Sequence, residues 1–251
     1  MGLVCKNCGA TAQSGFKFCN VCGTPIEPEI EITVSEPVQP YSDYMGIKGR
    51  ALRILTGPRA GEFVKAWPEC EIGREGTGLT LRDNTLSPHH SRLATTNDKT
   101  MLEDLDSLNG IFFKIKDKVV LKDNDLIRAG DHYFLYEVFS EEDVETEYGA
   151  DFYASPSRSE RFRLVEVLRG GRRGRASAAP DGGITVGRLE GDFTFPDDKK
   201  MSDRHFTIRW TQRGGILVDY SENGTFVQIH QAVQVEEGDI FFAGQTLLRV
   251  V

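Results

Sequence analysis

Residues 218–225 read Val-Asp-Tyr-Ser-Glu-Asn-Gly-Thr, and residues 105–110 read Leu-Asp-Ser-Leu-Asn-Gly. Each string follows a Ser-x-x-His motif, at 202–205 and at 87–90, and each motif follows a Gly-Arg pair. The spacing between the two copies is nearly constant, because 188 − 74 = 114, 202 − 87 = 115 and 223 − 109 = 114. An ordered set of matched landmarks at one offset indicates two copies of one domain.

The length of 251 residues accommodates two domains of about 100 residues each and a small appendage. Proline and acidic residues are dense after residue 26, and a second polar stretch separates the two copies, so both segments are expected to be linkers. The expected division is a cysteine-rich segment at 1–26, a flexible linker at 27–46, a first repeat at 47–139, an acidic linker at 140–160 and a second repeat at 161–251.

Both repeats have the pattern of β-strands. Short alternating segments rich in β-branched and aromatic residues, such as 51–55 and 111–115, are separated by Gly, Asp, Asn and Pro. This spacing is typical of the hairpins of a β-sandwich. Neither repeat shows an amphipathic helical pattern of about ten residues or more. The sequence therefore predicts an all-β fold with two β-sandwiches.

Four cysteines near the start form two knuckles, Cys5-x-x-Cys8 and Cys19-x-x-Cys22. Four thiolates on two tight turns make a closed tetrahedral shell for zinc, and a segment of about 25 residues needs such a metal to fold. We expect a small N-terminal zinc ribbon with structural Zn²⁺ as its cofactor, and a redox or disulfide arrangement is the alternative. Cys70 lacks a partner motif and is expected to be a buried apolar residue.

Composition restricts the class of partner. The net charge is −8, whereas nucleic-acid and anionic-membrane binders need clustered Lys and Arg, so neither partner is expected. No apolar run approaches the ~18 residues that would span a bilayer. No secretory signal precedes Cys5, and we expect a cytoplasmic protein.

The order Gly-Arg, Ser-x-x-His, Asn-Gly on an all-β background resembles the forkhead-associated (FHA) family, and the resemblance covers both repeats. Gly238-Asp239-Ile240, followed by Gly244, is similar to the closing string of that family. The resemblance implies β-sandwiches whose loops at one end bind a phosphothreonine peptide.

The residue types suit that ligand, because a phosphothreonine carries roughly −1.5 to −2 charges and three acceptor oxygens. An arginine fork donates to two of those oxygens together, a serine hydroxyl donates to a third, and an asparagine amide can hold the peptide backbone. The expected phosphopeptide-binding residues are Arg74, Ser87, Asn109, Arg188, Ser202 and Asn223. By the resemblance, the loop-structuring residues are Gly73, His90, Gly110, Gly187, His205 and Gly224.

The two expected sites differ in charge. Asp203 and Glu222 flank the phosphate-facing positions of the second repeat, where the first repeat has Pro88 and Leu108. Carboxylates repel a phosphate, so we expect the first site to bind more tightly, although neighbouring Lys and Arg side chains offset part of the repulsion.

The sequence shows no nucleotide-binding glycine loop and no nucleophile elbow, so we do not expect an enzyme. The expected function is an adaptor that binds phosphothreonine proteins, with a Ser/Thr kinase or its substrates as partners. Phosphorylated Thr146 or Thr33, which lie in the two linkers, would allow self-binding. The alternative is a zinc ribbon that contacts nucleic acid or the transcription or translation machinery, with FHA scaffolds that do not read phosphate.

The cysteine pattern generates the first testable prediction. Protein purified without chelator should contain about one zinc per chain by elemental analysis, because thiolate ligation provides the folding free energy of so short a segment. Cys5→Ser should remove the zinc and leave the β-sandwiches folded. Protein that contains no zinc, or that keeps a Cys19–Cys22 disulfide in reduced cells, would contradict the ribbon.

Overall fold

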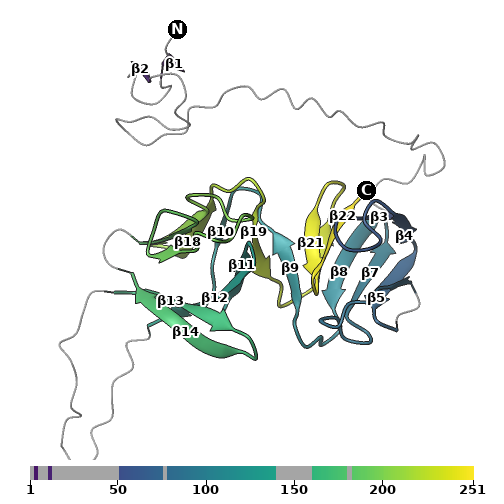
Figure 1. Cartoon of the computed structure of the whole chain (residues 1–251). Helices are drawn as coiled ribbons and strands as arrows, with labels where there is room; N and C mark the ends of the chain where they lie inside the picture. Colours follow the sequence, from purple (N-terminus) through teal and green to yellow (C-terminus); the bar gives the residue numbers. More distant parts are fainter. Residues whose placement is uncertain (1–2, 5–10, 13–50, 76–77, 140–159, 180–182) are drawn as a thin grey trace, which may run out of the picture. The chain divides into compact units, whose positions relative to one another are not determined.

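The computed structural model describes residues 3–4, 11–12, 51–75, 78–139, 160–179 and 183–251. Every regular element in these residues is a β-strand, so the all-β prediction is confirmed (Figure 1). They contain no helix that is long and apolar enough to cross a membrane.

The chain divides into two compact units, Met1–Gly46 and Ile47–Val251. In the first, β1 (Leu3–Val4) pairs antiparallel with β2 (Thr11–Ala12); Cys5, Cys8, Cys19 and Cys22 lie outside the described residues.

The two repeats form the same series of strands. The first contains β3 (Ala51–Ile54), β4 (Phe63–Lys65), β5 (Glu69–Gly73), β6 (Leu79–Thr80), β7 (Ser91–Thr96), β8 (Lys99–Asp104), β9 (Ile111–Lys114), β10 (Lys118–Val120), β11 (Leu126–Ala129) and β12 (His132–Val138). The second contains β13 (Phe162–Leu168), β14 (Arg172–Ala178), β15 (Ile184–Gly187), β16 (Phe193–Thr194), β17 (Phe206–Thr211), β18 (Gly214–Asp219), β19 (Thr225–Gln228), β20 (Val233–Val235), β21 (Ile240–Ala243) and β22 (Thr246–Val250). Alternation of buried and less buried side chains, as in β8 and β22, gives these strands one face for a core.

The repeats exchange their last three strands. β10 pairs with β18 and β12 pairs with β13, so the end of the first repeat completes a sandwich begun by the second. Conversely, β20 pairs with β8 and β22 pairs with β3. We call the sandwich of β3 to β8 with β20 to β22 sandwich I, and that of β13 to β18 with β10 to β12 sandwich II. One sheet, in the order β14-β13-β12-β11-β19-β9-β21-β22-β3-β4, runs through both.

Each hydrophobic core contains residues of both repeats. In sandwich I, Phe241 and Leu248 from the second repeat pack with Leu52 and Leu93 from the first, and all four side chains are fully buried. In sandwich II, the buried residues of the first repeat include Phe134, Tyr136 and Ile127. Burying one large apolar side chain stabilises a fold by about 1.5–3 kcal/mol, so each repeat supplies much of the stability of the other.

Strands β9 and β19 carry the chain from one sandwich to the other. They pair antiparallel at the centre of the long sheet, with Val227 opposite Phe113. The pairing extends beyond β9, because Ile115 N–H donates to the Thr225 carbonyl (3.0 Å). Ile111, at the start of β9, lies in the core of sandwich I, whereas Ile115 lies in that of sandwich II.

The sequence predicts one sandwich from residues 47–139 and a separate one from residues 161–251. In the structure, each sandwich contains strands from both ranges. Two residues beyond Ile115, the Asp117 carbonyl already accepts a hydrogen bond from Asp219 N–H (3.0 Å), so the chain continues straight instead of turning back to β8. Hydrophobic alternation specifies which face of a strand is buried, but it cannot distinguish between two equivalent partner strands. Exchange of equivalent strands between the two repeats therefore loses few contacts.

The exchange predicts a specific cross-link. Lys118 lies opposite Val218. Hydrogen bonds join residues 117 and 219 and residues 121 and 215, and because hydrogen-bonded and non-hydrogen-bonded pairs alternate along an antiparallel ladder, 118 and 218 form a non-hydrogen-bonded pair. Their Cα atoms should therefore lie about 4.5 Å apart, within the range for a disulfide. Lys118→Cys/Val218→Cys should form an intramolecular disulfide in monomeric protein, identified by peptide mass spectrometry.

The control is Lys118→Cys/Glu103→Cys. Glu103 is the first-repeat equivalent of Val218, since 218 − 103 = 115, and it would face Lys118 if each repeat closed on itself. This pair should not cross-link. A disulfide between 118 and 103, and none between 118 and 218, would contradict the strand exchange.

Candidate functional site

Site 1 is formed by three loops at one end of sandwich I, which follow β5, β6 and β8. Arg74, directly after β5, is held against the second loop: its N–H donates to the Ser87 carbonyl (3.1 Å), and its Nε donates to the Leu86 carbonyl (2.7 Å). Within the described residues, the guanidinium forms its hydrogen bond through Nε alone, and Arg74 is exposed. Its terminal nitrogens are therefore oriented by the protein and remain able to donate to a ligand.

Ser87 and Asn109 are joined to the same cluster. Ser87 Oγ accepts a hydrogen bond from Leu108 N–H (3.0 Å), which ties the second loop to the third. Asn109 Nδ2 donates to the Thr85 carbonyl (2.7 Å), which fixes the direction of the amide. Among the described residues Ser87 Oγ accepts a hydrogen bond and donates none, so its hydroxyl hydrogen remains available as a donor. The three predicted ligand-binding residues of the first repeat are thus brought together by one network.

His90 lies beneath this network and is fully buried. Its Nδ1 accepts from Ser87 N–H (3.1 Å), so its proton must be on Nε2, which lies 3.1 Å from the Gly110 carbonyl. Burial lowers the pKa of His90, which keeps the ring neutral, as this pattern of one acceptor and one donor requires. The ring links the Ser-x-x-His turn to the Asn-Gly turn and does not reach the ligand-facing surface.

Site 2 repeats this geometry in sandwich II. Arg188 N–H donates to the Ser202 carbonyl (2.8 Å), Ser202 Oγ accepts from Glu222 N–H (3.1 Å), and Asn223 Nδ2 donates to the Lys200 carbonyl (2.8 Å). The second histidine has the same role.

His205 is fully buried and accepts from Ser202 N–H through Nδ1 (3.1 Å), while its Nε2 lies 3.2 Å from the Gly224 carbonyl. Burial lowers its pKa as well.

The glycines before the two arginines permit the loops to approach closely. A Cβ on Gly73 would lie 2.0 Å from the Pro88 carbonyl oxygen, and one on Gly187 would lie 2.1 Å from that of Asp203, so any side chain would push the arginine loop away from the serine loop. Gly110 and Gly224 both have positive φ, of 71° and 94°.

The two sites differ in the partner to which the arginine guanidinium donates. Arg188 donates through Nε (2.9 Å) and through Nη2 (2.5 Å) to one carboxylate oxygen of Asp203. In the first repeat the equivalent position is Pro88, since 203 − 88 = 115, and it carries no charge. The fork that would bind phosphate at site 2 is therefore already occupied by an acid of the same chain, and a ligand has to compete with it.

A second difference lies behind the Asn-Gly turns. In the second repeat, Asp219 Oδ1 accepts hydrogen bonds from the hydroxyls of Ser221 (2.7 Å) and Thr225 (2.9 Å). In the first repeat Ile111 replaces Thr225, and Oδ1 of the equivalent Asp104 is buried without a hydrogen-bond partner among the described residues. One extra residue in that turn, Asp106 with φ of 55°, produces the change of offset from 115 to 114.

Each site also rests on the hairpin that the other repeat contributes. Asp83 Oδ2 accepts from Gln245 N–H (2.8 Å) at the tip between β21 and β22. Its equivalent Asp198 accepts from Asp131 N–H (2.9 Å) at the tip between β11 and β12. These two aspartates were not singled out from the sequence, although the matched offset 198 − 83 = 115 is a signal that could have identified them.

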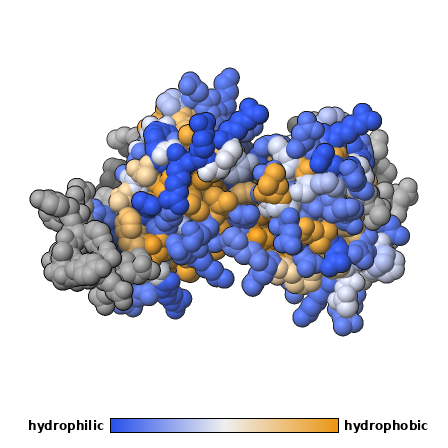
Figure 2. All heavy atoms as spheres, turned by 90° about the horizontal axis from the view of Figure 1, so that it is seen from below, coloured by the Kyte–Doolittle hydropathy of each residue, from blue (hydrophilic) through white to orange (hydrophobic). Residues whose placement is uncertain are grey.

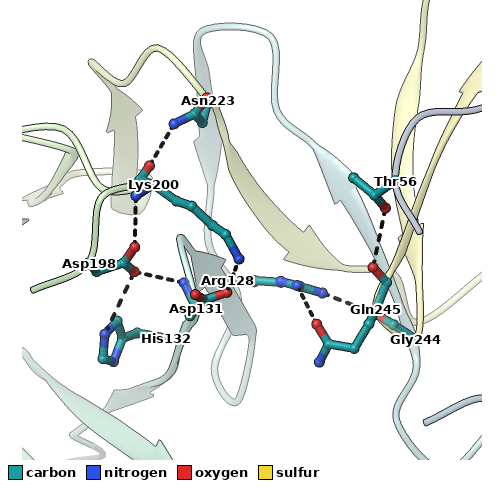
Figure 3. Close-up of polar contacts among 9 residues, drawn as sticks. All are labelled: Thr56, Arg128, Asp131, His132, Asp198, Lys200, Asn223, Gly244 and Gln245. Carbon is teal, nitrogen blue, oxygen red and sulfur yellow. Dashed lines mark hydrogen bonds and ion pairs between the residues drawn. The ribbon is translucent and has the colours of Figure 1, made fainter. Parts of the chain in front are cut away.

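The two hairpin tips meet through Arg128. Its guanidinium donates from Nη1 to the Gly244 carbonyl (3.1 Å) and from Nη2 to Gln245 Oε1 (3.0 Å) (Figure 3). The same view shows Lys200 extending from site 2 to Asp131, with Nζ 2.7 Å from Oδ1. The β11–β12 hairpin therefore contacts the loops of site 2 through Asp131 and the hairpin tip that supports site 1 through Arg128.

The described residues contain no group of three or more His, Cys, Asp or Glu that could hold a metal ion. Cys70 is buried, with 1% of its surface exposed, and burial raises the pKa of its thiol, so the predicted apolar role is confirmed. The predicted zinc ligands lie outside the described residues, and the zinc ribbon stays a prediction.

Comparison with known proteins yields one family. The family model described as FHA domain matches residues 70–130 and 184–244, and no curated protein matches the chain. The matched segments contain Arg74, Ser87 and Asn109 in the first case and Arg188, Ser202 and Asn223 in the second. FHA domains generally bind phosphothreonine peptides in signalling and are not catalytic. The two matches support two FHA copies in tandem in this chain.

Proposed function

We propose that this protein is a non-catalytic adaptor that binds phosphothreonine peptides at site 1 and at site 2. One observation carries the proposal: in each sandwich, an arginine, a serine and an asparagine from three different loops are held together by matching hydrogen bonds. At site 1, a structural role alone would not require the Arg74 guanidinium to keep oriented, unused donors at the surface. A dianionic phosphate satisfies such donors by charge-assisted hydrogen bonds.

Site 1 has the features of the stronger site. Arg74 is anchored through Nε to a carbonyl, so it loses little conformational entropy on binding a phosphate. Arg188 has to leave Asp203, or share its donors with it, and that carboxylate then lies next to the phosphate. Both effects weaken site 2 relative to site 1, in the direction expected from the sequence.

Further parts of the proposal concern residues outside the described structure. Zinc bound by the four N-terminal cysteines would order the ribbon, and a cytoplasmic Ser/Thr kinase or its substrates would supply the phosphothreonine. Thr146 and Thr33, once phosphorylated, would compete with partner peptides for the chain's own sites, because a tether raises the local concentration to the millimolar range.

An interaction with partner proteins that phosphatase treatment abolishes would support the adaptor function. Salt-sensitive retention on RNA or DNA would favour the alternative function of the zinc ribbon.

The experiment that tests phosphate recognition uses full-length protein and a fluorescent phosphothreonine peptide library. Arg74→Ala should abolish binding at site 1, and Arg188→Ala at site 2. Removal of one partner from a charge-assisted pair costs about 2–5 kcal/mol in binding, or more than tenfold in affinity. Thermal stability should be nearly unchanged, because an exposed arginine contributes little to folding. Equal affinity for phosphorylated and unphosphorylated peptides, by calorimetry, would refute the function.

The ranking of the sites is tested by Asp203→Asn in the Arg74→Ala background, where site 2 alone is measured. Loss of the competing carboxylate should raise affinity at site 2 by about threefold to tenfold, since an exposed ion pair is worth up to about 1 kcal/mol and the repulsion of the phosphate disappears too. Glu237→Gln makes the same change of charge at an exposed position of sandwich I and should have no effect. Unchanged anisotropy titrations for Asp203→Asn would show that the ion pair does not limit site 2.

A further inference from the structure

A groove of about 790 Å³ lies next to site 1, between residues of the two repeats. On the side of the first repeat it is lined by Leu108, Asn109 and Tyr133, and on the side of the second by Leu168, Arg169 and Gln245. Figure 2 shows hydrophobic residues gathered between two lobes of the surface. The two walls come from different repeats, and the pairing of β13 with the exchanged strand β12 joins them.

The groove is continuous with site 1. Thr85, Leu108 and Asn109 line it, and the same residues take part in the network that holds Ser87 and the asparagine amide. A peptide bound at Asn109 therefore has the groove directly beside it. The occupant of the groove is accordingly the part of the same peptide that flanks the phosphothreonine.

The opposite wall is the turn between β13 and β14. It is placed there because β13 pairs with β12, with Val167 opposite Tyr133. Leu168, the last residue of β13 before this turn, is 41% exposed, and Leu108, which also lines the groove, is 88% exposed. Two exposed leucines, one from each repeat, line the groove together with the buried Phe112 and offer apolar surface that a ligand side chain would remove from water.

The same turn carries an available positive charge. Of the arginines in this hairpin, Arg163 and Arg173 form ion pairs with Glu137, and Arg175 pairs with Glu166. Arg169 lines the groove, is exposed, and has no ion-pair partner among the described residues. In a protein with net charge −8, an unpaired arginine beside an apolar groove favours an acidic ligand side chain.

We propose that the groove binds the segment flanking the phosphothreonine of a site 1 peptide, with an apolar side chain between Leu108 and Leu168 and an acidic side chain at Arg169. The second repeat thereby selects the peptide that the first repeat binds. This inference rests on the proposed phosphothreonine function, and it adds the chemistry of the flanking residues.

The test uses the full chain with Arg188→Ala, so that site 1 alone is measured, and a library of phosphothreonine peptides with four varied positions on each side. The library should select one apolar and one acidic residue on the same side of the phosphothreonine. Arg169→Ala should reduce the preference for the acidic residue by about threefold to tenfold. Arg172→Ala removes an exposed arginine of the same hairpin that does not line the groove, and the preference should remain.

Leu168→Ser should weaken binding of the apolar peptide by about tenfold, whereas Leu189→Ser, an equally drastic change at an exposed leucine outside the groove, should not. Arg169→Glu should exchange the preference from an acidic to a basic residue, a gain that misfolding cannot produce. Phosphate-dependent binding whose flanking preferences are identical in Arg169→Ala, Arg169→Glu and Leu168→Ser would overturn the groove and leave the proposed function intact. Absence of any phosphate-dependent binding would overturn both.

Discussion

The antiparallel pairing of β9 with β19 determines how the rest of the molecule is assembled. These two strands form the centre of the ten-stranded sheet, and each carries its chain out of one sandwich and into the other. Because both strands cross at the same place, the three strands after β9, β10 to β12, belong to sandwich II, and the three strands after β19, β20 to β22, belong to sandwich I. Neither core is complete without apolar side chains from both repeats. The unit of folding is thus the pair of repeats, and the loops of each site are supported by a hairpin that the other repeat supplies.

Arg128 is an unusual component of this junction, since it is a cation with 3% of its surface exposed. Its guanidinium lies 3.5 Å from the ring centroid of Phe242 and donates to the tip of the opposing hairpin, while its Nε is buried without a hydrogen-bond partner among the described residues. Burial lowers the pKa of Arg128. Phe242 is the residue equivalent to Arg128 in the second repeat, since 242 − 128 = 114. The two halves of the junction therefore stack one repeat's arginine on the other repeat's phenylalanine, a contact that two identical repeats could not make.

This asymmetry extends to the two sites, which share a framework and differ in charge. Both have a neutral, buried histidine between the Ser-x-x-His and Asn-Gly turns, so their loops are positioned alike. Among the described residues, only site 2 has a carboxylate on its arginine, and only site 1 has a buried aspartate oxygen, Asp104 Oδ1, without a hydrogen-bond partner behind its asparagine. Two copies of one fold thus present different electrostatic surfaces, because a few side chains around the conserved geometry of the loops have been replaced.

The sequence by itself determined the strands, the two repeats and the loops that carry the site residues, because these follow from local patterns: alternation, turn residues and a constant offset of 114 or 115. The grouping of Arg74, Ser87 and Asn109 could be anticipated from the family resemblance. Only the tertiary structure decided that β10 pairs with β18 instead of β8, that Arg188 binds Asp203, and that the turn after β13 lines the same groove as Leu108. These contacts join residues distant in sequence, and two equivalent strands have equal local preferences. The choice between them depends on the path of the chain through β9 and β19, which no local pattern encodes.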